Sequence, residues 1–470
     1  MPELPEVENI RRALLPLVRG KKILDIEILK KRIIQGDVNK FKNTLIGRTF
    51  KDISRIGKYL FFHFDQDIVI VSHLRMEGKY IILEKGEPLT SHARVLFRLS
   101  DNTLLVYDDS RQFGLMILSD EKSYMNLKEI KKLGPEPFAA KPIDIYEKFQ
   151  GTSRPIKTVL LDQTFMTGLG NIYVDEVLFL NKIHPLTRTN LLTLPQVERV
   201  IKTSIDVLNA SIELGGSTVR SYQFSKDQIG EFQNFLKVYG KAGNKCVSCG
   251  HLLKKIKVSG RGTTYCPFEQ INPEAPLVIG ITGTIASGKT TLLNSLGALG
   301  YSTISSDQIV HQLYEQMEVK TRLNKIFSSI IFDDQGEVNR AQLANSILAE
   351  PLKKKELEKY IHPLVKEKIT GIIAKTPAKT ILFVEVPLLF EAGFEDLFNF
   401  VVGVIAPPER QLANLEIRGD NLLFAKQMIA QSKFPRYLNQ LDLLILNDGS
   451  KKDLLAKLET FVKPILKQLK

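Results

Sequence analysis

At positions 283–290 the chain reads Gly283-Thr284-Ile285-Ala286-Ser287-Gly288-Lys289-Thr290, which fits the pattern G-x-x-x-x-G-K-[ST] throughout. An apolar run, residues 277–281, leads into this stretch, and a helix-like segment, 291–299, follows it. In such a strand–loop–helix context backbone N–H groups surround a phosphate, Lys289 neutralises it, and Thr290 holds a magnesium ion. We therefore expect Gly283 and residues 286–290 to bind the phosphates of ATP with magnesium.

This loop normally opens a nucleotide-binding domain, yet residues 1–276 precede its strand. At 470 residues the chain has room for about three or more domains, each with its own core. Its 43% hydrophobic and 25% charged residues are typical of globular proteins. The sequence therefore predicts a nucleotide-binding domain behind a first part with a different chemistry.

The positive charge is concentrated in that first part. Residues 1–275 carry 41 Lys and Arg against 31 Asp and Glu, a surplus of 10, whereas 276–470 carry 24 against 21. A basic surface favours a polyanionic partner such as DNA.

The chain reads as a soluble, cytoplasmic protein. Three cysteines in 470 residues exclude a disulfide framework, and the start of the chain is acidic and interrupted by prolines, unlike a signal peptide. The most apolar stretch, 381–390, contains a Glu and a Pro and is too short to cross a bilayer, so we expect no membrane association.

The pattern of the chain changes several times along its length. Residues 3–14 have helical spacing, and short β-rich runs from residue 23 to about 117 predict an antiparallel sandwich. Residues 125–236 are helical, and the segment 271–276, with two prolines, predicts a linker. We expect a β-sandwich domain over 1–125, a helical domain over 126–240, a small Cys-bearing hairpin over 241–270, the linker, and an α/β domain with a parallel sheet over 277–470.

The opening Met1-Pro2-Glu3-Leu4-Pro5-Glu6-Val7-Glu8 resembles the formamidopyrimidine-DNA glycosylase family, bacterial enzymes that excise oxidised purines such as 8-oxoguanine. The resemblance covers residues 1 to about 270. It implies a catalytic β-sandwich, a helix-two-turn-helix DNA-binding domain, a zinc-finger-like hairpin, a monomeric glycosylase part and a duplex DNA substrate. Further matches follow in the family's order: Gly57-Lys58-Tyr59-Leu60, His73-Leu74-Arg75-Met76-Glu77-Gly78, Leu133-Gly134-Pro135-Glu136-Pro137, Gly168-Leu169-Gly170-Asn171-Ile172-Tyr173 and Gly260-Arg261-Gly262-Thr263.

The same resemblance implies the catalytic residues. Removal of the initiator methionine exposes the secondary amine of Pro2, and an α-amino group has a pKa of about 8. Pro2 would attack C1′ of the damaged nucleoside and form an iminium, with Glu3 as general acid/base. Lys58 and Arg261 match the positions assigned to the elimination steps that cut the strand.

DNA contacts are implied in the same way. A base inside a duplex has to be flipped out before an enzyme reaches it. Met76, Arg111 and Phe113 match the wedge with which the family fills the gap. The positions that grip the phosphate backbone are matched by His92, Lys157 and Asn171.

The finger departs from the family's pattern of four cysteines. Its ligand positions hold Cys246, Cys249, Cys266 and Glu269, so a carboxylate stands at the last one. Carboxylate oxygen ligates zinc at about 2.0–2.2 Å. Zinc bound by three thiolates and one carboxylate is one interpretation, and a metal-free finger held by packing is the other.

Residues 277–470 resemble dephospho-CoA kinase, which phosphorylates the 3′-hydroxyl of dephospho-CoA with ATP. The most specific match is Val386-Pro387-Leu388-Leu389-Phe390-Glu391. The resemblance implies that Asp307 accepts the proton of that hydroxyl and that Arg418 stabilises the transferring phosphoryl group; by local pattern, Asp307 equally suits an N-cap. Asn414 and Asn339 stand where the family has Arg and Asp.

Two enzymes on one chain is the interpretation that uses all of these residues. The alternative is a non-catalytic DNA-binding module fused to a different P-loop kinase. A non-catalytic DNA-binding module is disfavoured by the presence of Pro2, Glu3 and Lys58, because DNA binding alone needs none of them. A different P-loop kinase is disfavoured by Asp307 together with residues 386–391.

Overall fold

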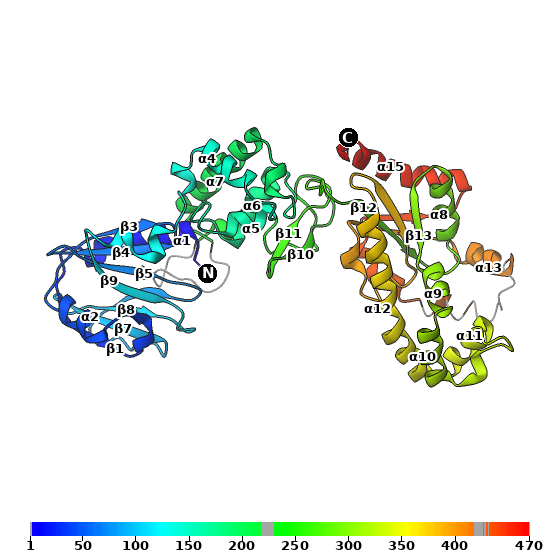
Figure 1. The fold of residues 1–470 in the computed structure, drawn as a ribbon, viewed down its shortest axis with the longest axis horizontal. Coiled ribbons are helices and arrows are strands. Elements are labelled where there is room, and N and C mark those ends of the chain that lie inside the picture. Colours follow the sequence, from blue (N-terminus) through cyan, green and yellow to red (C-terminus); the bar gives the residue numbers. More distant parts are fainter. Residues whose placement is uncertain (1, 218–229, 418–425, 427–428, 431, 470) are drawn as a thin grey trace. The chain divides into compact units, whose positions relative to one another are not determined.

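The fold was obtained as a computed structural model that describes residues 2–217, 230–417, 426, 429–430 and 432–469 (Figure 1). Its contacts divide the chain into two compact units. The first is residues 1–240 with 257–264, and the second is 241–256 with 265–470. The division therefore passes through the predicted finger, whose hairpin tip groups with the first unit, and not through the predicted linker.

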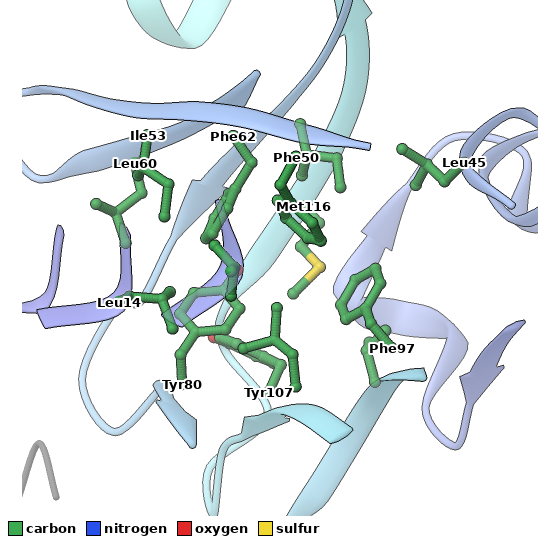
Figure 2. Packing of buried hydrophobic residues seen from close by; sticks show 14 of the residues in the cluster. Leu14, Leu45, Phe50, Ile53, Leu60, Phe62, Tyr80, Phe97, Tyr107 and Met116 are labelled. Atoms are coloured by element: carbon green, nitrogen blue, oxygen red, sulfur yellow. The ribbon is translucent and has the colours of Figure 1, made fainter. Parts of the chain in front are cut away.

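The first unit begins with two β-sheets that enclose a common core. One sheet has the order β1-β7-β8-β6 and the other the order β2-β9-β5-β4-β3. Helix α1 (Leu4–Val18) contributes its apolar face to the same core, and Figure 2 shows Leu14 of that helix near Tyr80, Tyr107 and Phe62. The strands are β1 (Ile23–Ile28), β2 (Ile34–Gln35), β3 (Phe50–Ile56), β4 (Tyr59–Phe64), β5 (Ile68–His73), β6 (Lys79–Leu83), β7 (Ala93–Leu99), β8 (Leu104–Asp108) and β9 (Leu115–Asp120), with helix α2 (Val38–Leu45) beside them.

Strand β4 shows why these residues form a sandwich. Its side chains alternate between two faces: Leu60, Phe62 and Phe64 enter the core between the sheets, whereas Tyr59 and Phe61 pack on the outer side. The outer side is covered by the segment around α3 (Lys128–Lys131). Alternation with a period of two, with both faces buried, explains why the strand is apolar except at the half-buried His63.

A helical part follows within the first unit. Its helices are α4 (Pro142–Gln150), α5 (Ile156–Leu161), α6 (Asn171–Leu180) and α7 (Leu194–Glu213). Leu4, the first residue of α1, packs into the core of these helices while the rest of α1 packs against the sandwich. The N-terminus of the chain is thereby fixed between the sandwich and the helices.

The finger is a short hairpin of β10 (Lys254–Val258) and β11 (Arg261–Tyr265). Its turn uses positive φ angles at Ser259 and Gly260. Glycine adopts this backbone region without strain.

The second unit is built on a parallel sheet with the order β13-β14-β12-β15-β16. One face packs against α8 and α15 and the other against α9, α10 and α12, as Figure 1 shows. Strands that are buried on both faces read as continuous apolar runs, which is the pattern of residues 277–281 and 381–384. The elements are β12 (Leu277–Gly283), α8 (Lys289–Ala298), β13 (Ser302–Ser305), α9 (Ser306–Tyr314), α10 (Met317–Phe327), α11 (Arg340–Ala349), α12 (Pro351–Lys375), β14 (Ile381–Glu385), β15 (Phe400–Ile405), α13 (Pro408–Ile417), β16 (Leu443–Leu446) and α15 (Lys451–Leu469).

The predicted fold class is confirmed: a β-sandwich, a helical part and a hairpin precede an α/β domain with a parallel sheet. Among the described residues, no helix has both the length and the apolar composition needed to cross a membrane.

Candidate active sites and cysteine cluster

The N-terminal segment of the first unit is buried against helix α6. Pro2 and Glu3 are both buried, and the Glu3 carboxylate accepts a hydrogen bond from the backbone N–H of Ile172 at 2.9 Å. Ile172 lies in the first turn of α6, whose N–H groups favour a negative charge. The backbone N–H of Glu3 donates to Glu6 Oε2 at 2.8 Å, and Tyr173 donates its hydroxyl to Oε1 of the same Glu6. Glu6 therefore orients the segment that carries the predicted nucleophile.

Glu3 and Lys58 are charged groups in the same apolar surroundings. Burial raises the pKa of Glu3 to about 7, while the nearby Lys58 ammonium lowers it and Glu6 raises it further. Burial likewise lowers the pKa of Lys58, whose Nζ donates to the carbonyl of Leu169 at 2.6 Å. A raised pKa on a carboxyl group and a lowered pKa on an amine are typical of groups that exchange protons with a substrate.

Arg261 lies close enough to Lys58 for its positive charge to contribute to the lowered pKa of that lysine. It is exposed at the start of β11. Helix α6 fixes this strand: Asn171 Nδ2 donates to the carbonyl of Gly262 at 3.0 Å, and Asp175 accepts the N–H of Thr264 at 3.0 Å. The structure thus brings the charged groups of Glu3, Lys58 and Arg261 into one part of the first unit, next to Pro2.

Lys157 differs from expectation. We predicted a phosphate contact, but its side chain is completely buried and its Nζ lies 2.5 Å from Asp175 Oδ1 and 3.3 Å from the carbonyl of Gly262. A cation contacts a DNA phosphate only when its head is exposed. In this structure Lys157 instead holds the hairpin against the helices, with Asp175 as its counter-ion.

The predicted wedge residues come together at the surface. Arg111 Nη1 lies 3.2 Å from the Met76 sulfur, and its guanidinium lies over the Phe113 ring at 5.1 Å. Phe113 is 44% exposed, a large fraction for an aromatic side chain. The cluster combines a cation with apolar side chains of the kind that insert between stacked bases.

Asp109 shapes the loop that carries this cluster, and the sequence analysis did not single it out. Its buried carboxylate accepts the backbone N–H groups of Arg111 and Gln112 at 3.0 Å and of Gly114 at 2.8 Å. An Asp followed by a short loop that ends in Gly is a recognisable turn signal. Arg94 donates to the Asp109 carbonyl at 2.8 Å, and His92, a predicted phosphate contact, is exposed beside it.

In the second unit the loop 283–290 lies at the carboxyl end of β12. Lys289 Nζ is 2.7 Å from the carbonyl of Thr284 and 3.3 Å from that of Gly283, so the ammonium lies inside the loop. Positive φ angles at Gly283 and Gly288 let the loop turn, and a Cβ at Gly283 would overlap the Val404 carbonyl. The loop N–H groups and the start of α8 form an anion-binding cradle.

Glu385 completes this site and was missed by the sequence analysis. It ends β14, is buried, and accepts the hydroxyl of Thr290 at 2.9 Å. The signal was present, because an acidic residue directly after an apolar strand of a P-loop domain commonly serves the metal ion of the nucleotide.

Two asparagines support the same loop. Asn414 Nδ2 donates to the carbonyl of Ala286 at 2.9 Å, and Asn447 Nδ2 donates to that of Ser287 at 2.8 Å. Asn414, noted above as a departure, therefore has a structural role. Beside them lies a cavity of about 220 Å³ whose polar lining includes Arg410 and Lys451.

Asp307 lies in the first turn of α9 and is exposed, near the carboxyl ends of β13 and β14. The N-cap of α9 is Ser305, so the alternative role of Asp307 as N-cap is not what the structure has. Asn339 is itself an N-cap, because its side chain accepts the N–H groups of Ala341 and Gln342 at 3.1 Å. Arg418 lies outside the described residues.

The three cysteines form one cluster in the second unit. The sulfur atoms of Cys246, Cys249 and Cys266 all lie within 4.8 Å of one another. Backbone N–H groups of Ser248 and Glu269 point at Cys246 and Cys266 over 3.5 and 3.4 Å, which stabilises thiolates. This donor set fits zinc. Among the residues that the structure describes, the Glu269 carboxylate is not part of that cluster.

Comparison with known proteins agrees with the first site. A formamidopyrimidine-DNA glycosylase of Bacillus cereus is 47% identical over 274 residues, which are 57% of this chain and 99% of the relative. The chain belongs to the formamidopyrimidine-DNA glycosylase family. The enzyme of Lactiplantibacillus plantarum is 43% identical over 272 residues, 57% of this chain and 99% of that protein. Family models for the N-terminal domain, the helix-two-turn-helix domain and the zinc finger match residues 1–116, 133–223 and 243–267.

Solved structures give the same result. A complex of the Lactococcus lactis glycosylase with DNA that contains an abasic site is 41% identical, with a TM-score of 0.56, and covers 58% of this chain and 100% of that one. A MutM complex with DNA that contains carbocyclic 8-oxoguanine reaches a TM-score of 0.55 at 41% identity, with the same coverage.

The second unit has a separate match. Residues 277–453 match the family model described as dephospho-CoA kinase. The chain is therefore an enzyme with two activities on one polypeptide, a formamidopyrimidine-DNA glycosylase followed by a dephospho-CoA kinase domain.

Proposed function

We propose that the first part excises oxidised purines from double-stranded DNA and cuts the strand through a covalent intermediate on Pro2, and that the second part phosphorylates the 3′-hydroxyl of dephospho-CoA. One observation carries the first assignment: Pro2 adjoins Glu3, whose carboxylate is buried, accepts the N–H of Ile172 at 2.9 Å and has its pKa raised by burial to about 7. A DNA-binding module has no use for a buried carboxylate whose pKa is near 7.

The covalent step begins once Met1 is removed, because only then is the Pro2 nitrogen a secondary amine. An α-amino group has a pKa of about 8, so a fraction of it is neutral near pH 7. Its lone pair attacks C1′, the bond from C1′ to the damaged base breaks, and the sugar is held as an iminium.

Glu3 handles the protons of this step. With a pKa of about 7 it is partly protonated at neutral pH, so it donates a proton to the opening sugar or to the departing base. The iminium then makes the C2′ proton acidic. Loss of that proton expels the 3′ phosphate by β-elimination, and δ-elimination releases the 5′ phosphate. We assign these eliminations to Lys58 and Arg261.

DNA is held and opened by exposed and half-buried residues of the same unit. Met76, Arg111 and Phe113 fill the gap left by the flipped nucleotide. Contacts to the phosphate backbone fall to His92 and Asn171. These contacts orient the enzyme without reading sequence, so affinity should fall steeply with salt.

In the kinase domain the loop 283–290 holds the ATP phosphates. Thr290 and Glu385 share a hydrogen bond at 2.9 Å, and together they suit a magnesium ion and its water ligands. The oxygen of the 3′-hydroxyl attacks the γ-phosphorus, and the bond between this phosphorus and ADP breaks. Asp307 accepts the proton that the hydroxyl loses. Arg418 stabilises the charge on the transferring group.

For the finger we propose a zinc ion held by Cys246, Cys249 and Cys266, with Glu269 as the fourth ligand after a change of side-chain conformation. Zinc when bound supplies structural stability to a hairpin that is too small for a core of its own. The three cysteines orient the hairpin arms.

The deciding experiment is borohydride trapping of the intact chain on lesion-bearing duplex. Reduction of the iminium should give a stable adduct of the chain with DNA, and Pro2→Gly should lose most of it. Efficient trapping by a chain with a blocked amino terminus would overturn the assignment to Pro2. Phosphorylation of dephospho-CoA by the same preparation, followed as ADP release, tests the second activity separately.

A further inference from the structure

The cysteine cluster belongs to the second unit, together with the kinase fold. Residues 241–256 and 265–276, which we call the finger lobe, group with residues 277–470, whereas the hairpin tip does not. All three cysteines of the chain lie in this lobe. The contacts that join the lobe to the kinase fold are of three kinds.

The first kind is a cluster of aromatic rings. His251 stacks on Phe268 with ring centroids 4.4 Å apart and planes at 9°, and both residues come from the finger lobe. The His251 ring also meets Phe400 of β15 at 5.4 Å and Phe461 of α15 at 5.6 Å. Phe400 and Phe461 meet edge to face at 5.6 Å, so the histidine lies against a preformed pair of kinase rings.

The second kind of contact is made by a buried carboxylate, that of Asp442. Asp442 precedes β16, its side chain has no exposed surface, and its Oδ2 accepts the N–H of Val401 in β15 at 2.8 Å. Its Oδ1 receives the N–H of Leu252 at 3.4 Å, and Lys254 Nζ lies 3.7 Å from Oδ2. Buried carboxylates need such partners, and two of these three come from the finger lobe.

The third kind lies on the other arm of the lobe. Tyr265 is buried and its phenol hydrogen-bonds to Asn399, whose side chain also accepts the N–H of Val278 in β12 at 2.7 Å. Phe268 and Ile271 pack against the core under α8 and α15. The finger lobe is thus attached through both of its arms.

Docking residues and cysteines are close neighbours in sequence on each arm. Cys249 is two residues before His251, and Cys266 lies between Tyr265 and Phe268. A metal ion that ties the cysteines together would hold both sets of docking residues in place. Loss of the ion would free both arms at once.

We propose that the finger lobe is a docked structural part of the kinase domain, and that metal bound at its cysteines stabilises the kinase fold through His251 and Tyr265. The metal part of this inference rests on the zinc binding proposed above, and the docking part does not.

The test follows thermal unfolding of the full-length chain. The kinase transition is identified as the one that a non-hydrolysable ATP analogue with magnesium shifts upward. His251→Ala keeps all three cysteines and should lower this transition by roughly 5–10 °C, because an aromatic contact is lost from a packed interface. His251→Phe, which keeps a ring, should restore most of the loss. Val247→Ala is the matched control, because Val247 lies in the same lobe and is 66% exposed.

Metal analysis and chelation complete the test. Removing the metal under reducing conditions should lower the same transition in the unmodified chain, and by much less in His251→Ala. A kinase transition that is unchanged in His251→Ala overturns the docking. If the purified chain contains the metal and chelation leaves the temperature of the kinase transition unchanged, the proposed coupling between metal and kinase fold is wrong. If the purified chain holds no metal, the zinc assignment and the coupling fail, while His251→Ala still decides the docking.

Discussion

Gly170 borders the Glu3 carboxylate so closely that a Cβ atom at position 170 would overlap it. The same carboxylate accepts the N–H of Ile172 at 2.9 Å, so it is enclosed between the backbone before α6 and the first turn of that helix. The glycine therefore provides the space in which the proposed general acid sits, and its role is steric.

Gly170→Ala should displace Glu3 and lower the rate of base excision by about 10²-fold, the effect expected when a catalytic group moves by about 1 Å. Binding to undamaged duplex should fall much less than excision, because the substitution leaves the wedge and His92 unaltered and keeps the side chain of Asn171, the neighbouring phosphate contact. Single-turnover excision and a binding titration separate the two effects. Gly151→Ala is the control, because a Cβ there meets only ordinary contacts at 3.5 Å or more. Excision by Gly170→Ala at the normal rate would contradict the packing argument.

The buried Glu3 should also make stability depend on pH. Its pKa rises from an ordinary 4.5 to about 7 on folding, mainly through burial. Because the folded pKa is the higher one, the folded state prefers protonated Glu3. This stabilisation is complete below about pH 4.5 and is lost as the pH rises through about 7.

Glu3→Gln should remove this dependence, because glutamine is neutral at every pH and keeps an oxygen that accepts the Ile172 N–H. Urea unfolding of both chains at several pH values between about 4.5 and 8 measures the difference. The unfolding free energy of the unmodified chain should fall relative to the variant up to about pH 7 and then level off. If the difference in unfolding free energy between the two chains does not change with pH, the raised pKa of Glu3 is wrong.

Local pattern predicted the elements and the phosphate loop, because each depends on neighbours in sequence. The alternation in β4 and the G-x-x-x-x-G-K-T spacing can each be recognised from consecutive residues, without knowledge of any residue far away in the sequence. The errors concern long-range contacts. Lys157 looks like a surface cation until Asp175 and the Gly262 carbonyl are brought to it by folding. Likewise, Glu385 gains its role only when β14 pairs with β12. The attachment of the finger lobe to Asp442 joins residues that no local pattern connects.

Asp109 should be needed to present the wedge. Asp109→Ala leaves three backbone N–H groups without their acceptor, each worth about 1–3 kcal/mol when buried, so the loop with Arg111 and Phe113 should lose its shape. We expect affinity for lesion-bearing duplex to fall at least about tenfold, measured by fluorescence anisotropy. Asp120→Ala is the matched control, because Asp120 accepts two N–H groups at 3.0 Å in a turn after β9. Equal losses in both variants would point to general destabilisation.

The last prediction separates the two enzymes on the chain. Lys289→Ala should abolish phosphoryl transfer, because its ammonium is the point charge inside the phosphate loop. Asp307→Asn should lower turnover at least about 10²-fold while ATP binding is kept, since it removes the proposed base and leaves the loop intact. Asp334→Asn, another exposed aspartate of the same unit, should have no effect. Base excision in the same preparations should be unchanged, because no residue of the Glu3 site is altered. Near-normal turnover of Asp307→Asn with dephospho-CoA would mean that another group accepts the hydroxyl proton.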